Sequence, residues 1–138
     1  MDSVNVSIVR QAYEDYRHGN LGKIKAALAD DVSWRVVGEQ NSFAPFGEWR
    51  TPDGALDYFD RLAKMLDTER LELEEFVAEG DTVIVTGRTF GVIKASRKKV
   101  EVEWIHVFKL KDGKITSYRE FLDTARLLAA ARVPEAVQ

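Results

Sequence analysis

The chain lacks cysteine entirely, which excludes disulfide bonds and thiolate chemistry. This fits a reducing compartment, and we expect a cytoplasmic protein. Histidine is scarce too: only His18 and His106 occur, and they fall in different predicted elements. A dedicated zinc site is therefore not expected, and no acidic spacing typical of a calcium loop occurs. We expect no metal and no other cofactor.

Long apolar runs are also missing. No stretch approaches the ~20 residues that a membrane-spanning helix needs. The first residues, MDSVNVSIVRQ, lack the basic region and apolar core of a signal peptide. The net charge of −3 leaves no broad basic surface for nucleic acid or anionic lipid. The basic run at 97–99 lies between two strand patterns and is expected to be a solvated hairpin tip. We therefore expect neither a nucleic-acid nor a membrane partner.

What the chain does have is enough length and apolar content for a substantial core. Its 138 residues, 45% of them hydrophobic, indicate one domain spanning residues 1–138. A chain of this length buries roughly two-thirds of its unfolded surface on folding. It is therefore large enough to enclose an internal cavity.

Helical patterns dominate the first half of the sequence. Apolar spacing predicts helices over 3–18 and 21–28 and a third that begins at the capping sequence Thr51-Pro52-Asp53. The expected buried stripe of that third helix is Leu56, Phe59, Ala63 and Leu66.

Strand patterns dominate the second half. Strands are expected over 71–79, 82–93, 99–110 and 114–122, after one early strand over 32–37. A short last helix over 125–132 would be capped by Thr124. This segregation predicts an α+β fold in which helices pack on one face of a curved, mostly antiparallel sheet.

The last two strands carry the most informative pattern. Val102, Trp104, His106 and Phe108 share one face of the first strand, and Thr116, Tyr118, Glu120 and Leu122 share one face of the second. One aromatic-lined face thus carries a single imidazole and a single carboxylate, which is typical of a small-molecule pocket.

The turn between these strands decides whether the two faces meet. A two-residue Asp112-Gly113 turn would pair His106 with Arg119 and separate it from Glu120. A three-residue loop over 111–113 would pair His106 with Tyr118 and Trp104 with Glu120. We favour the three-residue loop because it places both aromatic sets on one side of the sheet.

Glu120 and His106 are the candidate catalytic pair. Among aromatic neighbours Glu120 would be poorly solvated, so we expect its pKa to rise toward the range useful for proton transfer. His106 would be its partner, as a base or as a donor to a substrate oxygen. The alternatives are that Glu120 pairs with an arginine or faces water, and that His106 is a hydrogen-bonded core residue.

The remaining candidates would form the walls of the pocket or polarise a carbonyl, although core packing alone would also explain them. These candidate substrate-binding residues are Trp34, Trp104, Tyr118, Tyr13, Tyr16, Phe46, Phe59, Val102 and Leu122. Asp123 is expected to start the last helix rather than to be a pocket acid.

Three segments resemble the nuclear transport factor 2-like superfamily, specifically its SnoaL-like and ketosteroid isomerase-related branch. They are the Val9–Tyr16 helix, DDVSW at 30–34 and HVFKLKDGKITSYREFLD at 106–123. The resemblance implies a cone in which a bent mixed sheet wraps three helices around one deep apolar pocket. It also implies a homodimer, although members differ widely in chemistry.

The final hairpin also resembles that of limonene epoxide hydrolase, in which an aspartate takes the place of Glu120. That branch needs an Arg-x-Asp pair, but Gly87 and Thr89 occupy the corresponding positions in this chain. It also uses a tyrosine and an asparagine, which Trp34 and Val36 replace. Epoxide hydrolysis is therefore only a minor alternative.

The face opposite the pocket is expected to hold Ile105, Val107, Ile115 and Phe121, mixed with charged residues. Because such a face is too apolar to be wholly solvated, we expect a two-fold dimer through it.

The expected function is cofactor-free acid–base chemistry on a small, mostly apolar molecule that bears a carbonyl or hydroxyl group. Isomerisation, cyclisation and dehydration are the reaction types considered. The alternatives are a binding or accessory protein that uses the same pocket without turnover, and an assembly module that recruits partners through its exposed sheet face.

Overall fold

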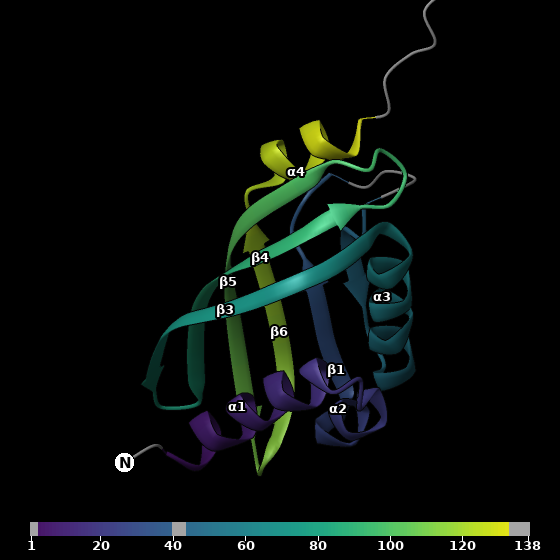
Figure 1. Ribbon diagram of the computed structural model, residues 1–138. Helices are drawn as coiled ribbons and strands as arrows, with labels where there is room; N and C mark the ends of the chain where they lie inside the picture. Colours follow the sequence, from purple (N-terminus) through teal and green to yellow (C-terminus); the bar gives the residue numbers. More distant parts are fainter. Residues whose placement is uncertain (1–2, 40–43, 133–138) are drawn as a thin grey trace, which may run out of the picture.

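The computed structural model describes residues 3–39 and 44–132, and it combines four helices with one six-stranded sheet in that part of the chain (Figure 1). The helices are α1 (Val4–Arg17), α2 (Leu21–Ala27), α3 (Pro52–Met65) and α4 (Thr124–Ala131). The strands are β1 (Leu28–Val36), β2 (Gly47–Trp49), β3 (Leu66–Glu79), β4 (Thr82–Ile93), β5 (Lys99–Lys111) and β6 (Lys114–Leu122). The expected α+β class is confirmed.

Side-chain caps fix where the helices begin. The Ser3 hydroxyl accepts from the backbone N–H of Val6 at the start of α1, and the Thr51 hydroxyl accepts from Gly54 at the start of α3. The start of α4 differs from the prediction. Asp123, not Thr124, is the cap, because its carboxylate accepts from the N–H of Arg126. Asp123 is thus the helix-start residue that we expected instead of a pocket acid.

The sheet is mixed and mostly antiparallel, with strand order β2-β1-β6-β5-β4-β3. Only β1 and β6 pair in parallel; the other neighbouring strands are antiparallel. The parallel pairing places Trp34 beside Tyr118 and Val36 beside Glu120. Strand β1 is longer than predicted, and the short strand β2 was not predicted. The strands that form the candidate site are therefore in the middle of the sheet.

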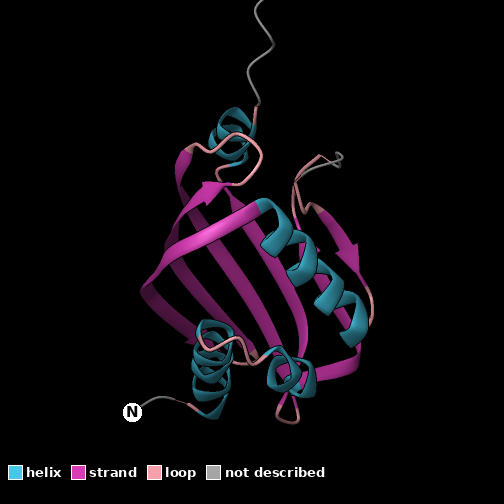
Figure 2. Ribbon diagram, turned by 45° about the vertical axis from the view of Figure 1, so that its right-hand side comes forward, coloured by secondary structure: helices cyan, strands magenta, loops and turns pink. Residues whose placement is uncertain are grey.

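The helices lie around one side of this sheet. Figure 2 shows α1 and α2 near one end of the strands, α3 alongside them and α4 at the opposite end. Side chains of α1 and α3 reach the same sheet face, since Tyr13 contacts His106 and Tyr58 contacts Glu120. Within the described ranges, no helix is long and apolar enough to cross a membrane.

The register of the β5–β6 hairpin differs from the prediction. Lys111 pairs with Lys114, so the turn consists of Asp112 and Gly113 alone, both with positive φ (51° and 78°). This is the geometry of the tight turn that suits an Asp-Gly pair. The expected three-residue loop is therefore wrong.

A β-bulge in β6 returns the side chains that follow it to the sheet faces that we predicted. Leu110 pairs with Ile115 but Lys109 pairs with Ser117, which leaves Thr116 as the extra residue. The Thr116 hydroxyl donates to the carbonyl oxygen of Lys109 across the bulge at 3.1 Å. The bulge shifts the frame by one residue, and His106 consequently pairs directly with Glu120.

Because of the bulge, one residue that we predicted on the outer face of the sheet lies on the inner face. Ile115 precedes the bulge and is 1% exposed on the helix-facing side, so it is not part of the opposite face. Ile105 and Phe121 are 44% and 42% exposed, as expected for that face, and they pair with each other. The basic run at 97–99 is exposed where the turn after β4 leads into β5, whose first residue is Lys99, as predicted.

Candidate active site

A cavity of about 110 Å³ lies between the helices and the sheet. It is lined by all of the candidate residues from the sequence: Tyr13, Tyr16, Trp34, Phe46, Phe59, Val102, Trp104, His106, Tyr118, Glu120 and Leu122. They come from helices α1 and α3, strands β1, β5 and β6 and the segment before β2. The fold therefore brings together residues that are far apart in the sequence.

Glu120 is the polar centre of this cavity. Its atom Oε1 accepts from the hydroxyl of Tyr58 at 3.1 Å, from the hydroxyl of Tyr118 and from Nε2 of His106 at 3.3 Å. All three donors converge on Oε1, and none of these contacts uses Oε2. The glutamate side chain is only 13% exposed. One carboxylate oxygen is thus held in place while the other takes no part in the network.

His106 lies between Glu120 and Tyr13. Its Nδ1 is 2.6 Å from the hydroxyl of Tyr13. Because Nε2 faces the carboxylate, that nitrogen carries a proton in either charge state of the ring. In the neutral ring Nδ1 then accepts from Tyr13, and in the cation it donates to Tyr13. The result is a chain from Tyr13 through His106 to Glu120.

The electrostatics of Glu120 differ from the prediction. Burial has the largest single effect and raises its pKa. The charge of His106 and the hydrogen bonds from His106, Tyr118 and Tyr58 together outweigh burial and hold the pKa of Glu120 below its ordinary value. The expected upward shift is wrong because the sequence did not reveal three donors on one oxygen. Glu120 is consequently ionised at neutral pH.

The pKa values of the tyrosines are shifted upward, in the opposite direction to that of Glu120. Burial, and then the negative charge of Glu120, raise the pKa of Tyr13, Tyr58 and Tyr118 well above the ordinary value. They therefore remain protonated donors across the physiological range. Tyr16 lies on the same helix stripe as Tyr13 and shows a raised pKa for the same first reason, but it hydrogen-bonds to Thr68 instead of Glu120.

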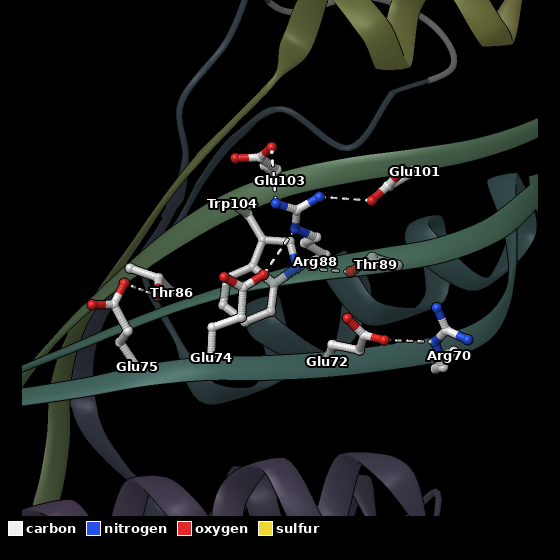
Figure 3. Close-up of polar contacts among 10 residues, drawn as sticks. All are labelled: Arg70, Glu72, Glu74, Glu75, Thr86, Arg88, Thr89, Glu101, Glu103 and Trp104. Atoms are coloured by element: carbon white, nitrogen blue, oxygen red, sulfur yellow. Dashed lines mark hydrogen bonds and ion pairs between the residues drawn. The ribbon is translucent and has the colours of Figure 1, made fainter.

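Trp104 fixes the ring of His106. The two rings stack with centroids 3.8 Å apart and planes 7° apart. The indole Nε1 of Trp104 donates to the hydroxyl of Thr89 at 2.8 Å (Figure 3). Gly87 lies against the same indole, where an added Cβ would come within 2.6 Å of the ring and 2.3 Å of the Glu72 carbonyl oxygen. Strand β4 is thus shaped to hold Trp104 in this position.

Trp34 makes up the facing wall. Its ring stacks on Tyr118 with centroids 3.8 Å apart, as the parallel pairing of β1 and β6 requires. Its Nε1 is buried and has no hydrogen-bond partner among the described residues. Trp34 therefore contributes a packing surface rather than a bond within this network.

Sequence reasoning missed Tyr58 and Thr89. The predicted stripe of α3 ran through Leu56 and Ala63, but the buried side chains are Ala55, Tyr58, Phe59 and Met65, and Ala63 is exposed. The adjacent pair Tyr58-Phe59 was a signal that the stripe lay one residue earlier. Thr89 carried no signal, because a threonine in a strand is ordinary.

The arrangement can accept, hold and return a proton inside an apolar cavity. In the described part of the chain, no group of three His, Cys, Asp or Glu side chains is placed to hold a metal ion. The polar groups around Glu120 are therefore hydroxyls and one imidazole.

Comparison with known families agrees with this geometry. The SnoaL-like domain family matches residues 9–118. The chain belongs to this family. SnoaL-like domains share the nuclear transport factor 2-like fold, which solved structures also display. A nuclear transport factor 2-like protein of unknown function from Burkholderia pseudomallei is 22% identical with a TM-score of 0.88, covering 96% of this chain and 100% of its own.

Two further solved structures are similar. A nuclear transport factor 2-like protein from Burkholderia xenovorans is 28% identical, with a TM-score of 0.83 over 94% of this chain and 96% of its own. TerC, co-crystallised with polyporic acid, is 21% identical, with a TM-score of 0.84 over 94% of this chain and 98% of its own. No curated protein matches the chain. The comparisons thus identify the family and fold of this SnoaL-like domain.

Proposed function

We propose that this SnoaL-like domain is a cofactor-free acid–base enzyme acting on a small, mostly apolar substrate that bears a carbonyl or hydroxyl group. Isomerisation, cyclisation and dehydration are the reaction types that one carboxylate in an apolar cavity serves. Glu120 would accept the proton and return it to the substrate, and His106, backed by Tyr13, would hold the carboxylate in place.

The observation that carries the proposal is the convergence of donors on Glu120 Oε1. A binding protein can scatter its polar groups along the walls, whereas an enzyme needs them at one point. Here Tyr58, Tyr118 and His106 meet at a single oxygen. An ionised carboxylate so held is preorganised for proton transfer.

The lowered pKa of Glu120 sets the pH range of this chemistry. A carboxylate of reduced pKa is a weaker base than we expected from the sequence, yet it is in the required ionised form at neutral pH. In the reaction, a substrate C–H or O–H bond breaks, its electron pair stays on the substrate and the proton moves to Glu120. Oε2, which the three donors do not use, is the oxygen free to accept it.

The experiment that tests this needs no known substrate. The protein is incubated in D₂O with a panel of small cyclic and aromatic ketones, and NMR follows the loss of the protons next to the carbonyl. An active domain exchanges these protons faster than buffer alone. Glu120→Gln should abolish the excess exchange, while Glu103→Gln, a matched change on the opposite sheet face, should leave it intact.

The alternative is a binding or accessory protein with the same cavity. The co-crystallisation of TerC with polyporic acid supports ligand binding by a relative with this fold, and it does so equally for a binder and an enzyme. Wild-type exchange no faster than buffer for every ketone, with ligand binding intact, would favour this alternative. Epoxide hydrolysis has little support, because Gly87 and Thr89 stand where an arginine and an aspartate would be needed.

A homodimer through the outer sheet face is part of the proposal. Ile105 and Phe121 form an exposed apolar pair on β5 and β6. Sedimentation at micromolar concentration should give a dimer, and Phe121→Asp should shift it toward monomer. A wild-type monomer under these conditions would contradict this part of the proposal.

A further inference from the structure

The cavity wall has few acidic or basic side chains. Among the described residues that line it, Glu120 is the one acidic side chain, His106 is the one basic side chain, and lysine and arginine are absent. The donors that satisfy Glu120 are otherwise the neutral hydroxyls of Tyr58 and Tyr118. Hydroxyl dipoles stabilise a carboxylate but leave its net charge in place. When the His106 ring is neutral, a ligand entering this cavity therefore meets a net negative charge in a poorly solvated space.

Aromatic rings make up much of the rest of the wall. Nine of the lining residues are aromatic: Tyr13, Tyr16, Trp34, Phe46, Tyr58, Phe59, Trp104, Phe108 and Tyr118. The face of an aromatic ring is electron-rich and attracts cations. Trp34, Tyr58 and Phe59 are tilted by 47° to 64° relative to one another instead of stacked, so their faces do not cover each other completely. The aromatic faces and the carboxylate thus favour the same sign of ligand charge.

From these two observations we infer that the cavity is selective for a small ligand bearing a protonated or quaternary amine. The aromatic faces hold the ammonium group, and Glu120 supplies the opposing charge within the same cavity. A carboxylate or phosphate ligand is rejected, because the described wall offers no cationic side chain to pair with it other than His106, which already faces Glu120.

This inference rests on the proposed function in that it assigns a substrate class to the same cavity. Proton abstraction leaves the C–H electron pair on the substrate, while Glu120 becomes neutral on receiving the proton. The substrate therefore gains the negative charge that Glu120 loses. A substrate with its own ammonium group balances that charge internally, which the wall does not do.

The size of the cavity restricts the ligand further. An engineered apolar cavity of about 150 Å³ in another protein holds one benzene molecule. The cavity here, at about 110 Å³, suits a compact head group such as trimethylammonium rather than a fused polycyclic molecule.

Three probes of matched shape test the charge selectivity. Choline carries a trimethylammonium group, 3,3-dimethylbutan-1-ol replaces its nitrogen with carbon, and 3,3-dimethylbutanoate carries a negative charge. Each is titrated into the full-length protein, and binding is followed by the NMR signals of the Trp34 and Trp104 indole N–H groups. We expect choline to bind at least about tenfold more tightly than the neutral alcohol, and the anion to bind more weakly than either.

Variants assign the selectivity to the cavity. Glu120→Gln should reduce the advantage of choline over the alcohol severalfold while leaving the alcohol's affinity nearly unchanged. Glu103→Gln is the matched control, because Glu103 is exposed on the opposite sheet face, and it should leave both affinities unchanged. Wild-type-like NMR spectra of each variant establish that the fold is retained.

Three results would overturn the inference: equal affinity for choline and the alcohol, tighter binding of the anion, or no binding of any probe at millimolar concentration. An undiminished choline preference in Glu120→Gln would overturn the role assigned to Glu120. These outcomes are distinguishable from failure of the proposed enzyme activity, which would appear as unchanged ketone exchange in Glu120→Gln.

Discussion

The two faces of the central sheet hold their charges in different ways. On the inner face, Glu120 is 13% exposed and is held by two tyrosine hydroxyls and an imidazole. On the outer face, Arg88 of β4 is held by three glutamates, at 2.8 Å from Glu74, 2.9 Å from Glu101 and 3.5 Å from Glu103 (Figure 3). The inner carboxylate has mostly neutral partners, whereas the outer arginine has partners of opposite charge.

The difference separates a structural charge cluster from a reactive one. Water surrounds the Arg88 cluster and screens it, so each of its ion pairs contributes little to stability. Glu120 keeps its negative charge in a cavity with little water, where it acts strongly on its surroundings.

The largest effect is expected from removing the titratable group of the inner face. Glu120→Gln keeps the shape of the side chain, and activity should fall by about 10²–10⁴-fold, the usual contribution of one positioned acid or base. His106→Gln should also lower activity, and the double variant should cost little more than the worse single change, because the two groups act as a unit. Single-turnover rates of the four proteins would measure this; additive losses would contradict it.

The next effect concerns pH. Because the pKa of Glu120 is lowered, NMR titration should give a value below the ordinary ~4.3, and Tyr118→Phe should raise it by removing a donor. A depressed carboxylate pKa stabilises the fold above the unfolded-state pKa. This contribution is lost as the pH falls through the folded-state pKa. The stability of Glu120→Gln should therefore lack this loss at low pH. A Glu120 pKa above ~4.3 in the wild-type protein would contradict the prediction.

A smaller effect is expected from loosening the indole that stacks on His106. Thr89→Val is nearly isosteric and removes the acceptor for Trp104 Nε1, which leaves a buried donor unsatisfied at a cost of about 1–3 kcal/mol. The free energy of unfolding should fall by that amount, and kcat should fall with little change in KM. Thr89→Ser, which keeps the hydroxyl, is the control and should restore kcat; equal losses in both variants would indicate packing alone.

The smallest effect is expected on the outer face. Arg88→Met removes the exposed cation and should change the melting temperature less than any inner-face variant, with the difference diminishing at high salt. Ketone exchange and choline binding should not change. A loss of either in this variant would show that the outer face contributes to the inner site, and would remove the contrast between them.

The sequence was sufficient to predict which side chains meet, although not how they pair. Strand alternation placed Trp104, His106, Tyr118 and Glu120 on one face, and the structure agrees, because the bulge at Thr116 offsets the one-residue change that the shorter turn introduces. The pairing of His106 with Glu120 could not be predicted, since it depends on a bulge at Thr116 that has no compositional signature.

The fold class followed from the order of helix and strand patterns, but the donors on Glu120 did not. Tyr58 reaches Glu120 from a helix 62 residues away in sequence, and no local pattern reports such a contact. The direction of the Glu120 pKa was wrong for the same reason. Burial is visible in composition, but the number of hydrogen bonds to a single oxygen is a property of the assembled structure.

The bulge at Thr116 also determines how the chain tolerates length changes. It lies between the tight turn and the part of β6 that lines the cavity. This one extra residue therefore determines which face of the sheet each side chain from 117 to 122 occupies. Deleting Thr116 with the turn unchanged would leave these pairings intact, whereas pairing Thr116 with Lys109 in a regular ladder would expose Glu120 to solvent and turn Arg119 and Phe121 toward the cavity. Whether Thr116 bulges or pairs thus determines whether the domain carries an inward acid or an inward base.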